Sequence, residues 1–82
     1  MTNARLLDTA VRLALGRPED VVLTDAGYGK TDGWDSVGHI ELMTALEEAF
    51  DILIEADDVF EMSDYAAVRR VLEIRYRVDL GG

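Results

Sequence analysis

The segment from Ser36 to Phe50 most constrains what this chain can fold into, because its apolar residues recur with helical spacing. Asp35, directly before it, is a good helix N-cap, and its charge suits the positive end of a helix dipole. Asp51 ends the run. The apolar stripe consists of His39, Leu42, Leu46 and Phe50, with Met43 and Ala49 beside it. The pattern predicts an amphipathic helix over 36–50.

Two other segments have the same periodicity, and one is a shorter candidate. Asn3 to Leu15 predicts a helix that ends at Gly16, before Pro18. Ser63 is expected to cap a last helix from Asp64 to about Arg77. Asp57 to Met62 predicts a short helix. The inward residues are expected to be Leu7, Ala10, Val11 and Ala14 in the first helix, with Leu6 and Leu13 beside them, and Tyr65, Val68, Val71 and Leu72 in the last.

The remaining segments predict connections. Glu19 to Trp34 has no sustained period and contains three glycines, which favours a long loop with one short helical turn. Val21, Val22 and Leu23 are expected to enter the core. Ile52 to Glu55 alternates like a strand, but nothing else in the chain would pair with it, so a descending loop is expected. Leu42, Leu46, Phe50, Ile54, Val59, Val68 and Leu72 are the expected central core.

These elements predict an all-α fold. It is a small four-helix bundle, with three main helices, one short helix and a long loop after the first helix. The 82 residues form a single domain, 1–82, with its core at about 4–78. Gly81-Gly82 is expected to be a frayed end. With no Cys and a single His, the chain predicts neither a disulfide nor a metal site.

Charge is distributed unevenly along the chain. The sequence has 17 acidic and 8 basic residues, a net charge of −9, and no Lys or Arg from Thr31 to Val68, where eleven acids lie. This disfavours nucleic acid as a partner. It is compatible with docking of basic partners or with a surface that is simply solvated. No stretch approaches the ~20 apolar residues of a membrane span, and the N-terminus lacks a signal-peptide core. A cytoplasmic monomer is expected.

The stretch from Gly27 to His39 contains fragments of three motifs. Gly29-Lys30-Thr31 resembles the end of a phosphate-binding loop, but the pattern needs glycine where Thr24 stands. Ser36 and Gly38 match half of a hydrolase elbow, but Trp34 replaces its first glycine. A Ser36–His39 pair could serve an esterase, yet no third group is placed to orient His39, which favours a core histidine.

The third interpretation of this stretch is that it contains a serine to which a phosphodiester-linked arm is attached. Such a serine must be exposed, lie at the end of a rigid element and tolerate added negative charge. The first turn of a helix provides this, because its free N–H groups and positive dipole end favour phosphate. Ser36 is at that position. A separate transferase would activate the hydroxyl, so no internal base is needed. The alternative is that Asp35-Ser36 is only an N-cap pair.

The chain resembles the acyl carrier protein family from about Arg5 to Tyr76. The family's pattern is a Gly or similar residue, then Asp-Ser-Leu, then a helix with Val-Glu-Leu and later an acidic turn. Here these become Gly33, Asp35-Ser36-Val37 and Ile40-Glu41-Leu42. The segments Ala45–Phe50 and Phe60–Met62 are also similar to the family.

The resemblance implies a non-enzymatic carrier. Ser36, preceded by Asp35, would hold a covalent 4′-phosphopantetheine arm from coenzyme A, making the chain a phosphoprotein. The arm would present acyl thioesters in fatty-acid, polyketide or related biosynthesis. The helix over 36–50 would dock basic patches of the phosphopantetheinyl transferase and of acyltransferases, ketosynthases or acyl-activating ligases. The expected docking residues are Val37, Glu41 and Glu48, with Asp35 and Glu47 secondary.

Two departures and several rival functions remain open. Gly38 stands where relatives often have a polar residue, and Val37 replaces the usual leucine, which suggests a different partner set. Trp34 is expected to cover the loop as a lid; alternatively it touches the arm. The rivals are an aminoacyl or peptidyl carrier, an unmodified acidic interaction module, and a small esterase that uses Ser36 and His39.

Overall fold

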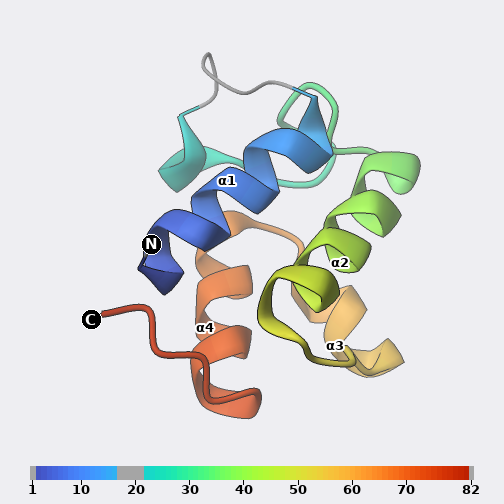
Figure 1. Cartoon of the computed structure of the whole chain (residues 1–82). Coiled ribbons are helices and arrows are strands. Elements are labelled where there is room, and N and C mark those ends of the chain that lie inside the picture. Colours follow the sequence, from blue (N-terminus) through green and yellow to red (C-terminus); the bar gives the residue numbers. More distant parts are fainter. Residues whose placement is uncertain (1, 17–21, 82) are drawn as a thin grey trace.

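Four α-helices and one short 3₁₀-helix make up the computed structural model, which describes residues 2–16 and 22–81 (Figure 1). The elements in chain order are α1 (Asn3–Leu15), η1 (Leu23–Asp25), α2 (Ser36–Phe50), α3 (Ala56–Glu61) and α4 (Tyr65–Arg75). Within the described ranges there is no strand, only an isolated antiparallel bridge between Gly27 and Asp64. This confirms the expectation of a small helical domain with three longer helices and a short one.

The ends of the two best-predicted helices are fixed by local chemistry. Thr2 caps α1 by accepting a hydrogen bond from the Arg5 N–H at 3.2 Å, and Gly16 ends it with a φ of 69°. Asp35 caps α2, as predicted. Asp51 ends α2 in the left-handed region with a φ of 54°, which Asp tolerates better than most residues.

The predicted start of the last helix is wrong by one residue. Asp64, not Ser63, is the N-cap of α4, because its carboxylate accepts from the Ala67 N–H at 2.7 Å. The Ser63 carbonyl instead accepts from the Tyr28 N–H at 2.8 Å, and the Ala26 carbonyl accepts from the Tyr65 N–H at 3.0 Å. These bonds tie the first loop to the start of α4.

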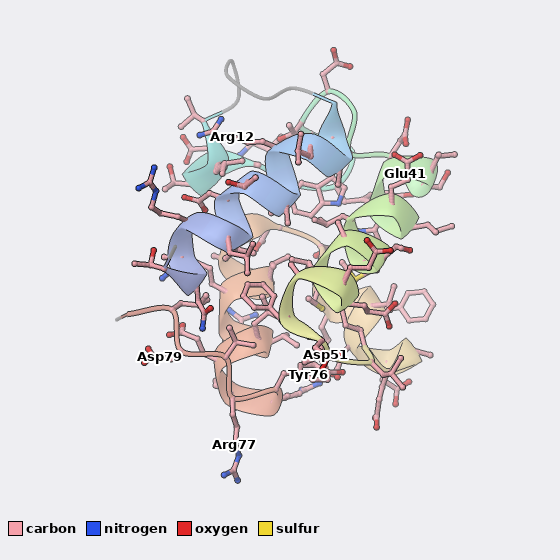
Figure 2. The ribbon with its side chains drawn as sticks, viewed as in Figure 1. Arg12, Glu41, Asp51, Tyr76, Arg77 and Asp79 are labelled. Atoms are coloured by element: carbon pink, nitrogen blue, oxygen red, sulfur yellow. The ribbon has the colours of Figure 1, made fainter. Side chains whose placement is uncertain are left out.

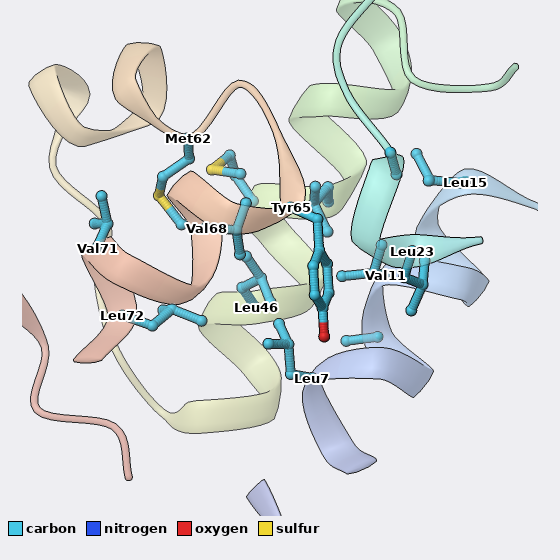
Figure 3. Packing of buried hydrophobic residues seen from close by; sticks show 14 of the residues in the cluster. Leu7, Val11, Leu15, Leu23, Leu46, Met62, Tyr65, Val68, Val71 and Leu72 are labelled. Carbon is cyan, nitrogen blue, oxygen red and sulfur yellow. The ribbon is translucent and has the colours of Figure 1, made fainter. Parts of the chain in front are cut away.

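The core lies where the four helices face one another (Figure 3). α1 packs along α2, and α4 closes the opposite side. The predicted centre is confirmed for Leu42, Leu46, Val68 and Leu72, which are fully buried, whereas Phe50, Ile54 and Val59 are half-buried at its edge. The core also contains residues that the predicted centre lacked, namely Leu15, Ala26, Trp34, Met62 and Leu80.

Two expectations about the chain's connections are corrected. Val22 is 68% exposed, and only Leu23 of its segment is buried; Val21 lies outside the described residues. The core extends beyond its expected bound of about 78, since Leu80 is 3% exposed and the Val78 N–H donates to the Leu72 carbonyl at 3.0 Å. Gly81 is exposed, and Gly82 lies outside the described residues. The segment after α4 returns beside the start of α1, so the packed core extends to position 80 (Figure 1).

In the described part of the chain, no helix is long and apolar enough to cross a membrane.

Candidate functional site

Ser36 is the first residue of α2, and its side chain is exposed. The Asp35 carboxylate accepts from the Gly38 N–H at 2.9 Å, and the Asp35 carbonyl accepts from the His39 N–H at 2.8 Å. The N–H groups of Ser36 and Val37 have no acceptor among the described residues. The Ser36 hydroxyl therefore lies beside two unpaired donors, at the positive end of a 15-residue helix.

Two glycines allow the preceding loop to lie against this first turn. A Cβ on Gly38 would be 1.9 Å from the Gly33 carbonyl oxygen, and a Cβ on Gly33 would be 2.4 Å from the Leu15 carbonyl oxygen. Gly33 also has a φ of +90°, a conformation that favours glycine. Packing therefore requires glycine at position 38. The loop approaches α2 closely because Gly38 has no side chain, and it approaches the end of α1 closely because Gly33 has none.

Trp34 is part of the core rather than an exposed lid. It is 1% exposed, and its indole lies edge to edge with the His39 imidazole, with 6.2 Å between ring centroids and 21° between the ring planes. The indole Nε1–H donates to His39 Nδ1 at 2.9 Å. At this burial the indole is enclosed by the core, which argues against contact between Trp34 and an arm on Ser36.

His39 has partners on both ring nitrogens. Nδ1 accepts from Trp34, and Nε2 lies 2.8 Å from the Val59 carbonyl oxygen. Because an indole N–H only donates and a carbonyl only accepts, these contacts assign the proton to Nε2. Neither nitrogen is directed at Ser36 as a base. In this arrangement the Ser36–His39 pair that an esterase would use is not formed.

The phosphate-loop fragment is also folded in a way that does not suit phosphate. The N–H groups of Lys30 and Thr31 donate to the Gly27 carbonyl at 3.1 and 2.9 Å, and the Gly29 N–H donates to the Trp34 carbonyl at 2.9 Å. A phosphate-binding loop instead directs such N–H groups at its ligand. The loop is closed upon itself, with the Thr31 hydroxyl accepting from the Gly27 N–H at 3.0 Å.

A groove of about 440 Å³ opens beside Ser36, between α2 and α3. Its lining is mainly apolar and consists of Tyr28, Ser36, His39, Ile40, Val59, Phe60 and Ser63. Ile40 is 67% and Phe60 is 83% exposed, so large apolar side chains remain uncovered next to the serine. Sequence reasoning missed Tyr28 and Phe60, because neither a loop nor a six-residue helix has a period that identifies its exposed face.

The residues expected to dock partners divide into two groups. Val37, Glu41 and Glu48 are exposed on α2, and Glu41 points away from the helix bundle (Figure 2). Glu47 is half-buried, and its carboxylate accepts from the Ile54 N–H at 2.9 Å, while Asp35 caps the helix. The structure thus leaves Val37, Glu41 and Glu48 exposed on the helix that begins at Ser36, and it gives Glu47 and Asp35 internal contacts.

A second polar cluster joins α3 to the C-terminal end of α4. Asp58 is 5% exposed, and its carboxylate accepts hydrogen bonds from the Tyr76 hydroxyl and the Arg75 guanidinium. These contacts, that of Tyr76 first, hold the pKa of Asp58 below its usual value of 3.8 against the opposing effect of burial. Arg75 also pairs with Glu61 at 2.9 Å, and the Tyr76 hydroxyl accepts from the Glu55 N–H. Figure 2 shows Tyr76 at the lower end of the bundle.

A comparison with protein-family models, with curated proteins and with solved structures found no match for this chain. Among the described residues, no group of three or more His, Asp or Glu side chains is arranged to hold a metal ion.

Proposed function

We propose that this chain is an acyl carrier protein that holds a 4′-phosphopantetheine arm on Ser36. The observation that carries the proposal is the setting of this serine. Ser36 is exposed in the first turn of α2 and lines an apolar groove, and the N–H groups of Ser36 and Val37 have no acceptor among the described residues. An attached phosphodiester would lie at the positive end of the helix, where an anion is favoured.

The attachment chemistry requires an enzyme other than this chain. The Ser36 oxygen would attack the pyrophosphate of coenzyme A at the phosphorus that bears pantetheine. A phosphodiester would form, 3′,5′-ADP would leave, and the hydroxyl proton would pass to a base of the transferase. Because both His39 nitrogens are engaged by Trp34 and Val59, an external base is needed, and this supports a carrier over an esterase.

The exposed face of α2 supports docking of basic partners. Glu41 and Glu48 lie on it with Val37, and no Lys or Arg occurs from Thr31 to Val68. A face of one charge sign raises the rate at which oppositely charged partners associate. We therefore assign Val37, Glu41 and Glu48 to partner contact, with phosphopantetheinyl transferases and acyl-transferring enzymes as the partner class. The assignment of acyl rather than aminoacyl cargo rests on the sequence resemblance.

The test is the intact mass of the purified protein before and after incubation with coenzyme A and a broad-specificity phosphopantetheinyl transferase. We expect the wild type to gain one phosphopantetheinyl group and Ser36→Ala to gain none. A matched control is Ser63→Ala, which removes the other serine that lines the groove and should leave loading intact. If the wild type gains no mass, an unmodified helical module with an acidic face becomes the better proposal.

A further inference from the structure

His39 belongs to α2 and contacts both the first loop and α3. Its Nδ1 accepts from the Trp34 Nε1–H at 2.9 Å, and its Nε2–H donates to the Val59 carbonyl at 2.8 Å. The Tyr28 ring stands edge-on to the imidazole, with 5.6 Å between centroids. Three parts of the groove wall therefore meet on one imidazole.

The bond to Val59 supplies a partner that α3 cannot provide for itself. In a continuing helix, the Val59 carbonyl would accept from the N–H four residues later, that of Ser63. Here the Ser63 N–H donates to the Glu61 carbonyl at 2.9 Å, because the chain turns away toward α4. His39 thus satisfies one of the carbonyls left over at the end of a six-residue helix.

α3 depends strongly on such outside contacts. A helix of six residues has little stability of its own, and Glu55 makes no side-chain cap at its start. Its described polar anchors on other elements are Asp58, bonded to Arg75 and Tyr76, Glu61, paired with Arg75, and the Val59 carbonyl, bonded to His39. Only the His39 contact is on the side of the groove that Ser36 borders.

We propose that His39 is a positioning residue. It fixes α3 against α2 and so sets the shape of the groove beside Ser36, where the transferase would meet the attachment site. The functional part of this inference rests on the proposed carrier function. The imidazole does so as a relay, with the Trp34 indole holding the ring and the ring holding α3. It takes no part in the chemistry at Ser36.

Two variants separate the halves of the relay. The amide of Asn reaches about as far as Nδ1, so His39→Asn keeps an acceptor for Trp34 and loses the bond to Val59. The amide of Gln reaches about as far as Nε2, so His39→Gln keeps a donor for Val59 and loses the acceptor for Trp34. Tyr65→Phe is the matched control, because it removes a hydrogen bond between α4 and Asp8 of α1 without touching α3.

The first readout is native-state hydrogen exchange of the unloaded protein. The amides to follow are those of Val59 and Met62, which donate to the Glu55 and Asp58 carbonyls. We expect His39→Asn to speed their exchange roughly fivefold or more relative to amides of α1, His39→Gln to speed it less because only the indole contact is lost, and Tyr65→Phe to leave that ratio near the wild-type value. Fluorescence of Trp34, the only tryptophan, should shift in His39→Gln and not in His39→Asn.

The second readout is the kinetics of loading by the transferase. A displaced α3 lowers the share of molecules whose site is arranged for docking, so His39→Asn should raise KM roughly two- to threefold with kcat unchanged. Equal acceleration of the α3 amides in all three variants would overturn the proposal, and an unchanged KM despite loosened α3 would reduce His39 to a structural role. If wild type is not loaded at all, the carrier function fails, while exchange still decides whether His39 positions α3.

Discussion

α2 and α3 form the two walls of the same groove, but they are held in place in different ways. α2 has 15 residues, a side-chain cap at Asp35 and a long contact with α1. α3 has six residues and no side-chain cap, and His39, Arg75 and Tyr76 of other elements hold it. Ser36 therefore lies on a rigid wall, whose helix is held by its own cap and by packing on α1. The opposite wall, α3, is held by side chains of other elements, so substitutions there can alter it selectively.

The largest expected effect comes from disturbing the rigid wall at Gly38. In Gly38→Ala the new Cβ would meet the Gly33 carbonyl at 1.9 Å, and backbone cannot yield as a flexible side chain can. We expect a loss of about 3 kcal/mol in the free energy of unfolding, measured by urea denaturation.

Gly27→Ala is the control for this prediction. Gly27 is also buried, but a Cβ there would meet only ordinary contacts at 3.5 Å or more. It should change stability by less than about 1 kcal/mol. Equal losses for the two substitutions would contradict the close approach of the loop to α2.

The second effect concerns the anchor of α3 at Asp58. Asp58→Asn replaces a buried carboxylate that accepts from Arg75 and Tyr76, so we expect a loss of about 1–2 kcal/mol in unfolding free energy, with faster exchange in α3 than in α2. Asp57→Asn is the control, because Asp57 is an exposed neighbour in the same first turn. A loss as large at Asp57 would mean that the helix terminus, not the anchor, is responsible.

The same anchor predicts a dependence on pH. The folded-state pKa of Asp58 is lowered, so the unfolded chain binds its proton more readily and the anchor contributes stability above the usual value of 3.8. That contribution is lost as the pH falls through this value and below. Denaturation at pH 6 and pH 3 should therefore show a smaller difference for Asp58→Asn than for wild type. An equal difference would argue against the anchor.

The comparison also explains how far the sequence could predict the structure. The helices at 3–15 and 36–50 were predictable, because their caps and apolar periods are local and span several turns. Asp57 and Asp58 look alike in sequence, yet only Asp58 is buried, since its partners lie 17 and 18 residues away. The Trp34–His39–Val59 contacts and the burial of Leu80 are likewise non-local.

Part of the candidate site could be predicted for the same reason. Ser36 at the first turn of a helix follows from the local N-cap pattern, and the exposure of Glu41 and Glu48 follows from the apolar period of the same helix. The groove could not be predicted, because it depends on where α3 and the loop residue Tyr28 meet α2. The close approach at Gly38 depends on the backbone of Gly33, whereas the sequence alone shows only a departure from the family's usual polar residue.

A smaller effect distinguishes the two acids near the end of α2. Glu47 accepts from the Ile54 N–H and fixes the segment that leads into α3, whereas Glu48 is exposed. Glu47→Ala should lower the unfolding free energy by about 1 kcal/mol, and Glu48→Ala should lower it by less than about 0.5 kcal/mol. Thermal denaturation of both variants in one buffer checks the order, and a reversed order would contradict the assignment of Glu47 to the fold.

The smallest expected effect on stability should accompany a clear effect on partner association, because the substituted residue lies on the exposed face of α2. Glu48→Lys reverses a charge on the exposed face of α2 without removing a described contact, so the midpoint of unfolding should stay within error of wild type. The rate of loading by the transferase should fall several-fold at low salt, and its decline with added salt should become shallower, because screening then has less attraction to weaken. Glu73→Lys reverses a charge on α4 instead and controls for net charge, because both variants change it by the same amount. Equal slowing by the two substitutions would mean that partners respond to the total charge of −9 rather than to the exposed acids of α2.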